Sequence, residues 1–108
     1  MNPQNLNSDT YVIAVNNTSL KATIKTTYQD GTNVLLRNGS DNPVFVMASE
    51  SSSNTIVYPN SATTPLDGQI ILPGAVETFE LNKNQNYIYA IQATSGTGNL
   101  YITPGNGV

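Results

Sequence analysis

The sequence contains no histidine and no cysteine, and only 10% of its residues are charged. Without cysteine the chain has no disulfide and no thiolate nucleophile. Without histidine it lacks the usual base that activates a serine, and metal ligands would have to be oxygen atoms, which suit Ca²⁺ or Mg²⁺ rather than Zn²⁺. These absences predict a protein that is not an enzyme and that carries no cofactor or metal.

Long apolar runs and clusters of basic residues are missing as well. No apolar run approaches the roughly 18 residues that a membrane-spanning helix needs. Four basic and seven acidic residues give a net charge of −3, which argues against nucleic acid or an anionic membrane as a partner. The N-terminus has neither the basic nor the apolar region of a secretory signal, so we expect the chain to be made and folded in the cytosol.

The chain is rich in short β-type segments and in neutral polar residues. Asn, Ser and Thr account for 37 of its 108 residues. Leu20, Ala22 and Ile24 alternate with polar residues, and Glu80 separates two apolar residues that we expect to face inward, Phe79 and Leu81. About eight such segments, spaced by roughly ten residues, predict one all-β domain over residues 10–108. We expect a β-sandwich or small β-barrel of antiparallel strands, with a jelly roll as one possible arrangement.

Two turn signals suggest how the strands are connected. Asp30-Gly31 predicts a tight hairpin that returns through residues 33–38, and residues 95–98 predict another that leads into residues 99–103. Residues 49–68 are irregular apart from a short strand predicted at residues 55–58. A loop of this length is typical of a mobile segment or of one that makes contacts.

Several strands are apolar on both faces, which leaves their orientation open. For the strand at residues 44–48 we expect cover on both sides, either by ordinary sandwich packing or by a sister subunit. The residues expected on the outer side of their strands are Phe45, Met47, Ile88 and Ala90, and those expected to face the core are Tyr87, Tyr89 and Ile91.

Few residues suggest chemistry. Glu77 and Glu80 are three apart on a predicted strand, so their side chains should point to opposite faces and cannot flank one glycosidic bond. A Ca²⁺ site built from two loop aspartates is an alternative, although no EF-hand spacing supports it. Tyr58 and Tyr101 are the tyrosines that we expect to be exposed, and they would be candidates for stacking on a sugar ring.

Residues 1–9 are polar and show no periodicity, which predicts a flexible N-terminal arm. Such an arm is either a frayed terminus or a segment that becomes ordered on a partner. The candidate partner contacts of the chain are Asn2, Pro3, Gln4, Asn5 and Leu6 in the arm, together with Phe45, Met47, Tyr58 and Tyr101.

Three parts of the sequence carry a family resemblance: residues 34–38 with 43–46, residues 68–79, and residues 87–91 running to 100–105. Their layout resembles small structural proteins of tailed bacteriophages, in particular head decoration (cement) proteins. The resemblance implies a structural virion protein, here a homotrimer, on the outer capsid surface, where it bridges major capsid protein subunits and stabilises the head. The alternatives are a tail, baseplate or fibre module and a carbohydrate-binding β-sandwich.

Overall fold

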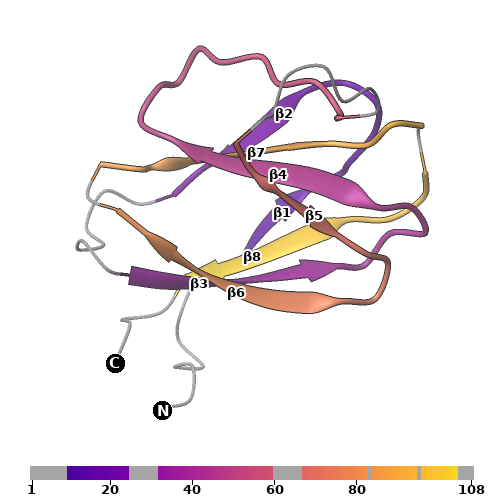
Figure 1. Ribbon diagram of the computed structural model, residues 1–108. Coiled ribbons are helices and arrows are strands. Elements are labelled where there is room, and N and C mark those ends of the chain that lie inside the picture. The colour runs from indigo at the N-terminus through magenta and orange to yellow at the C-terminus, as the bar shows by residue number, and fades with distance from the viewer. Residues whose placement is uncertain (1–9, 25–31, 60–66, 83, 95, 105–108) are drawn as a thin grey trace.

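The structure is a computed structural model, which describes residues 10–24, 32–59, 67–82, 84–94 and 96–104. Within these ranges it contains eight strands and no helix (Figure 1). The strands are β1 (Tyr11–Ile13), β2 (Leu20–Thr23), β3 (Thr32–Asn38), β4 (Val44–Ser49), β5 (Gln69–Ile71), β6 (Val76–Leu81), β7 (Tyr87–Ile91) and β8 (Leu100–Pro104).

The strands form two four-stranded sheets that stack as two layers (Figure 1). Sheet A has the order β1-β8-β3-β6 and sheet B the order β2-β7-β4-β5, and all neighbours are antiparallel. The strands pair from the two ends of the chain inward: β1 with β8, β2 with β7, β3 with β6, and β4 with β5. The eight strands therefore correspond to one long hairpin folded over so that its pairs alternate between the two sheets. This order is that of a jelly roll, and the predicted all-β sandwich is confirmed.

Both hairpins predicted from turn residues are wrong. Strands β2 and β3, on either side of Asp30-Gly31, belong to different sheets, and so do β7 and β8. Asp30, Gly31 and Ser95 themselves lie outside the described residues. A turn signal shows only that the chain reverses, whereas in this topology most connections cross from one sheet to the other. Among the described strands, only β4 and β5 are both consecutive and hydrogen-bonded to each other.

The core lies between the sheets and consists of the inward side chains of every strand. The predicted alternation is confirmed in β2, where Ala22 is buried, and in β6, where Leu81 is buried and Glu80 is exposed. The buried residues of this main core are Ile13, Val15, Ala22, Ile24, Val34, Leu36, Val44, Val46, Ile71, Leu81, Ile88, Ala90, Leu100 and Ile102.

A buried polar cluster closes one end of the sandwich. Asn38 and Gln92 are 0% and 1% exposed. The Asn38 Nδ2 donates to the Ile71 carbonyl at 2.8 Å, the Gln92 Nε2 donates to the Ser40 Oγ at 2.8 Å, and the Gly96 amide donates to the Gln92 Oε1 at 3.0 Å. Every buried side-chain polar atom of the described residues has a partner. The cluster therefore joins three loops and has a structural role.

Candidate functional site

The outer side of strands β4 and β7 in sheet B is covered by the chain itself. Residues 50–58, which follow β4, arch over this sheet in Figure 1, and we call them the covering segment. Together with side chains of β4 and β7 they form a second apolar cluster. Its buried members are Phe45, Ile56, Tyr89 and Ile91, and Met47, Tyr58 and Tyr87 pack against it.

Hydrogen bonds hold the covering segment in place. The Tyr89 hydroxyl donates to the Ser51 carbonyl at 2.6 Å and accepts from the Asn54 amide at 3.0 Å. The Lys21 Nζ donates to the Ser52 carbonyl and lies 5.4 Å from the centre of the Tyr87 ring, a cation–π contact. A single tyrosine on the central strand β7 thus bonds two points of the segment.

The predicted orientation of β7 is wrong. Ile88 and Ala90 belong to the main core, whereas Tyr87, Tyr89 and Ile91 face outward beneath the covering segment. Both faces of β7 are apolar, so periodicity alone could not separate them. The short strand predicted at residues 55–58 is also absent, because the backbone there bonds to side chains: the Ile56 amide donates to the Ser19 Oγ at 3.1 Å.

The structure places three of the candidate contacts in this cluster. Phe45 is 3% exposed and is covered by its own chain. Met47 and Tyr58 are half-buried, and the Tyr58 ring meets the Phe45 ring edge-on at 6.5 Å between centres. The Phe45 ring is not accessible to a ligand, and the Tyr58 ring is partly covered. The arm candidates Asn2, Pro3, Gln4, Asn5 and Leu6 lie outside the described residues.

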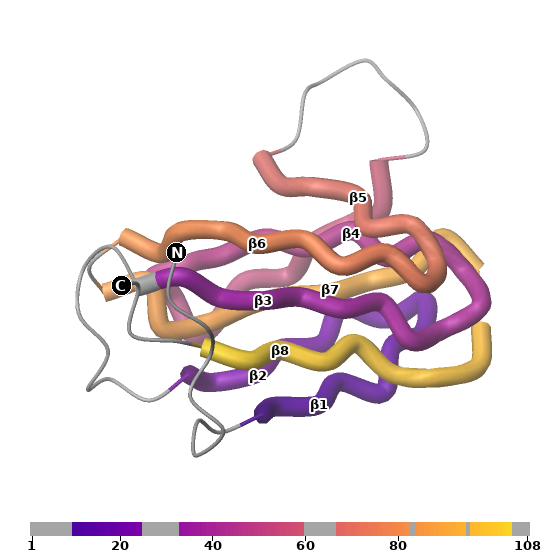
Figure 2. The backbone as a smooth tube through the Cα atoms, turned by 90° about the horizontal axis from the view of Figure 1, so that it is seen from below, coloured from indigo at the N-terminus to yellow at the C-terminus, as the bar shows by residue number. Residues whose placement is uncertain are grey.

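Within the described ranges, nothing covers the outer side of sheet A. Its four strands place Val12, Tyr101, Arg37 and Val76 side by side in one row, because each pairs with the next in register. Val12 is 54% exposed and Val76 is 51% exposed. No described segment crosses this side, which faces the viewer in Figure 2. We call it the open face.

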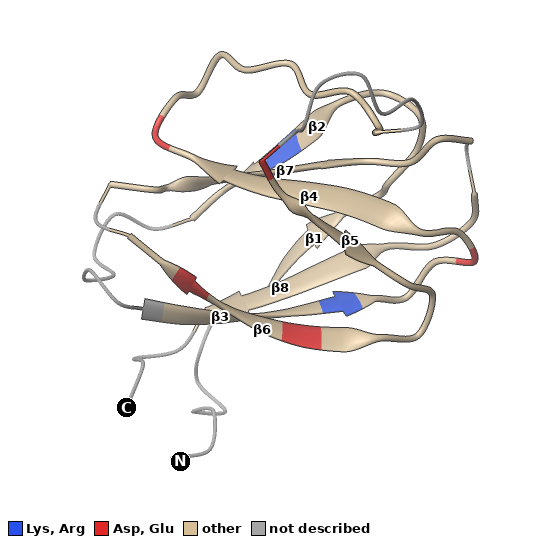
Figure 3. Ribbon diagram, viewed as in Figure 1, with Lys and Arg blue, Asp and Glu red and all other residues tan. Residues whose placement is uncertain are grey.

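A second row beside the first continues the open face with neutral groups. Leu35 pairs with Thr103 of β8 and with Thr78 of β6, and Leu35 is half-buried. One row further on, Glu80 pairs with Asn33. The charged residues of sheet A in the described ranges are on β3 and β6 (Figure 3), and of these Arg37 and Glu80 lie on the open face. The face therefore combines aliphatic, aromatic and hydroxyl groups with one basic and one acidic side chain.

Tyr101 is the one described candidate contact on the open face. Its side chain is half-buried because the ring lies against the end of β3, where a Cβ at Gly39 would come within 2.7 Å of the ring. The Asn99 Nδ2 is 3.5 Å from the Tyr101 hydroxyl, the outer limit of a hydrogen bond. Because Gly39 has no side chain, the Tyr101 ring can pack against the backbone there instead of projecting from the sheet.

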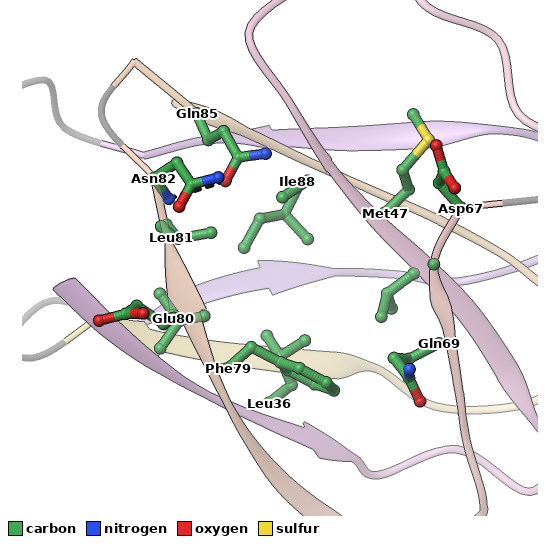
Figure 4. A pocket seen from close by; sticks show the side chains of 14 residues that line it. Leu36, Met47, Asp67, Gln69, Phe79, Glu80, Leu81, Asn82, Gln85 and Ile88 are labelled. Carbon is green, nitrogen blue, oxygen red and sulfur yellow. Dashed lines mark hydrogen bonds between the residues drawn. The ribbon is translucent and has the colours of Figure 1, made fainter. Parts of the chain in front are cut away.

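A cavity of about 300 Å³ lies between the sheets along β6. In Figure 4 its interior is apolar, with Leu36, Phe79 and Ile88, while Asp67 stands on one side and Gln85 on the other. It is present because β5 is only three residues long and leaves the gap beside β6 uncovered.

The described acidic residues do not gather into one site. Glu77 and Glu80 are exposed and point to opposite faces of β6, as predicted. No cluster of three or more acidic residues in the described ranges could hold a metal ion. Those ranges also contain no helix long and apolar enough to cross a membrane.

No protein-family model, no curated protein and no solved structure matches the chain. The jelly roll is therefore assigned from the strand order alone. The sequence did not reveal the open face, since Val12 and Val76 are far apart along the chain. Only the register of four strands brings them into one row with Tyr101 and Arg37.

Proposed function

We propose that this chain is a structural virion protein that docks on the outer surface of an assembled bacteriophage capsid and stabilises it by bridging major capsid protein subunits. The docking surface in this proposal is the open face of sheet A. The capsid is proposed as the partner because the sequence resembles head decoration proteins. The open face is proposed as the surface that contacts it.

The observation that carries the proposal is the difference between the two outer faces. Residues 50–58 bury the large apolar groups of β4 and β7 on sheet B and leave its edge strand β5 open, where Ile70 is 43% exposed; on sheet A, Val12 and Val76 are about half exposed in one row. Exposed apolar groups gathered on one face are typical of a surface that binds another protein. The low charge of the face suits close packing against a protein wall, and many weak contacts on one shell act together.

The test is binding to empty capsids of the source phage, measured by co-sedimentation of the purified chain. The variant combines Val12→Glu with Val76→Glu and places two carboxylates on the open face. The matched control is Val57→Glu, which changes a residue of the covering segment that is 60% exposed. We expect saturable binding of the wild type and the control, and at least a tenfold loss for the double variant.

Two results would contradict the proposal in different ways. If Val57→Glu loses binding and the double variant keeps it, the docking surface lies over sheet B. If the wild-type chain does not bind capsids, the decoration role is wrong, and binding to phage tails or to a glycan array becomes the next measurement. Tyr101→Ala separates those two alternatives, because stacking on a sugar would need that ring.

We further propose that the docked form is a homotrimer, as the resemblance implies. Sedimentation equilibrium of the free chain, and the ratio of this chain to major capsid protein on saturated capsids, both measure the copy number. A reconstruction of saturated capsids that shows single, separated copies, instead of three copies around each threefold position, would contradict the trimer. That result would leave the docking surface unchanged.

A further inference from the structure

Strand β6 is the longest of the described strands at the edge of a sheet. It pairs with β3 on one side only, and it is six residues long. The other edge strands, β1, β2 and β5, have three, four and three residues. Short edge strands are one way in which proteins avoid pairing with other chains. Strand β6 lacks this protection.

The hydrogen-bond pattern shows which backbone groups of β6 face the free side. At the start of β6 the Asn38 amide donates to the Ala75 carbonyl at 3.1 Å, and the Gly74 amide donates to the Asn38 carbonyl at 2.8 Å. Gly74 has a φ of 79°, and the two residues opposite Asn38 form a β-bulge. Every second residue of β3 from Asn38 therefore bonds to β6. By the same alternation, the N–H and C=O groups of Thr78 and Glu80 point to the free edge.

The cavity lies along this free edge. Phe79 and Leu81 of β6 line it from sheet A, and Val46 and Ile88 line it from sheet B. Its volume of about 300 Å³ equals the share of roughly ten water molecules in the liquid. A strand added beside β6 would hold every second side chain over this apolar space, as β6 itself does.

Charge limits what such a strand could be. On β6 the charged residues are Glu77 and Glu80, Asp67 stands at the cavity, and the described residues that line the cavity include no Lys or Arg. Lys83 lies outside the described residues. Antiparallel pairing of β6 with β6 of a second copy would bring carboxylates of the two copies close together, which is unfavourable. Residues 1–9 contain no Lys or Arg and no apolar alternation, so they do not fit either.

We propose that β6 accepts a fifth strand for sheet A, supplied by an extended segment of a partner protein in which aliphatic residues alternate with Lys or Arg. Its backbone bonds to Thr78 and Glu80, its aliphatic side chains fill the cavity, and its basic side chains meet Glu80 on the outer side. Strand addition of this kind takes affinity from the backbone and specificity from alternate side chains. The inference goes beyond the proposed function, because it holds whatever assembly the chain joins.

The probe is a synthetic peptide of about eight residues in which valine and lysine alternate, with both ends blocked. It is titrated into the full-length chain while backbone amide signals are followed by NMR. We expect saturable shifts of the Thr78 and Glu80 amides. A peptide of the same composition with its lysines in one block should bind at least fivefold more weakly, because it cannot alternate.

Two pairs of variants separate strand addition from general attraction of a basic peptide. Thr78→Pro removes an N–H that β3 does not use, whereas Thr78→Val keeps it. We expect at least a tenfold loss of affinity for the first and little change for the second. Glu80→Lys should weaken binding about threefold or more. Glu50→Lys changes the net charge of the protein by the same amount, but it lies on the covering segment rather than on β6. It should therefore weaken peptide binding less than Glu80→Lys does.

Several outcomes would overturn the inference. One is a peptide that leaves the Thr78 and Glu80 amides unshifted at saturation, and another is equal binding of the alternating and block peptides. If Thr78→Pro is folded by circular dichroism and binds as well as Thr78→Val, the backbone edge is not used. If Thr78→Pro does not fold, the Glu80→Lys and Glu50→Lys pair decides, and equal losses in both would contradict the proposal.

Discussion

The two outer faces of this sandwich differ in how much of their surface the described chain covers. Sheet B carries Phe45, Tyr89 and Ile91 on its outer side, and the covering segment buries all three, while Ile70 on the edge strand β5 is 43% exposed. Sheet A carries Val12 and Val76 with Tyr101 and Arg37, and no described segment covers them. Both sheets have four strands, so the size of the sheet does not explain the difference.

Composition explains it better. Large aromatic and aliphatic side chains gathered on one sheet would form a patch that favours aggregation, and each aromatic contributes a large apolar area. The covering segment removes such a patch from solvent on sheet B. The rows of sheet A mix valines and a leucine with threonines and an arginine, so this face can remain in water while still offering apolar contacts. The comparison indicates that the covered part of sheet B stabilises the fold, whereas the open face is the surface for which we propose a binding role.

The largest expected effect comes from removing the aromatic ring at the base of the covered cluster. Phe45→Ala should lower the free energy of unfolding by about 3–5 kcal/mol, because it leaves a cavity between β4 and the covering segment. The measurement is urea denaturation followed by circular dichroism. Tyr101→Ala on the open face is the matched truncation and should cost about 1 kcal/mol. Equal losses at the two positions would contradict the distinction between the faces.

A smaller effect should follow from releasing the covering segment without removing a ring. Tyr89→Phe deletes the hydroxyl that bonds Ser51 and Asn54 and should cost about 1 kcal/mol. Hydrogen exchange of the Asn54 amide should become faster, since its acceptor is lost. Tyr101→Phe is the control on the open face, where the hydroxyl has a single contact at the limiting distance of 3.5 Å, and we expect no measurable change. Unchanged exchange at Asn54 in Tyr89→Phe would mean that the hydroxyl does not hold the segment.

Local alternation predicted the elements of this fold well, and turn signals predicted its connections badly. Strands such as β2 and β6 follow from alternating apolar residues, which depend only on near neighbours in the sequence. The pairing of β1 with β8, or of β2 with β7, joins opposite ends of the chain. Asp30-Gly31 favours a chain reversal, but the partner of each strand is set by packing between distant segments.

The candidate site was predictable to a lesser degree. Both Phe45 and Met47 were expected on the outer side of their strand, which is correct, but what covers them was left open between a sister subunit and ordinary packing. The covering segment could not be foreseen, because residues 50–58 form no strand and are held mainly by side-chain hydrogen bonds. The row on the open face depends on register, which single strands do not reveal.

The smallest expected effect is also the sharpest test of the open face. Val12→Thr combined with Val76→Thr keeps side chains that are branched at Cβ and should change the free energy of unfolding by no more than about 0.5 kcal/mol, because both valines are half exposed. The same substitution at Val44, which is 0% exposed, should cost about 1–3 kcal/mol, since it buries a hydroxyl. Urea denaturation of both variants gives the comparison. A loss above about 1.5 kcal/mol in the double variant would mean that the two valines are packed within the free protein. The open face could then bind a partner only after a rearrangement of the chain.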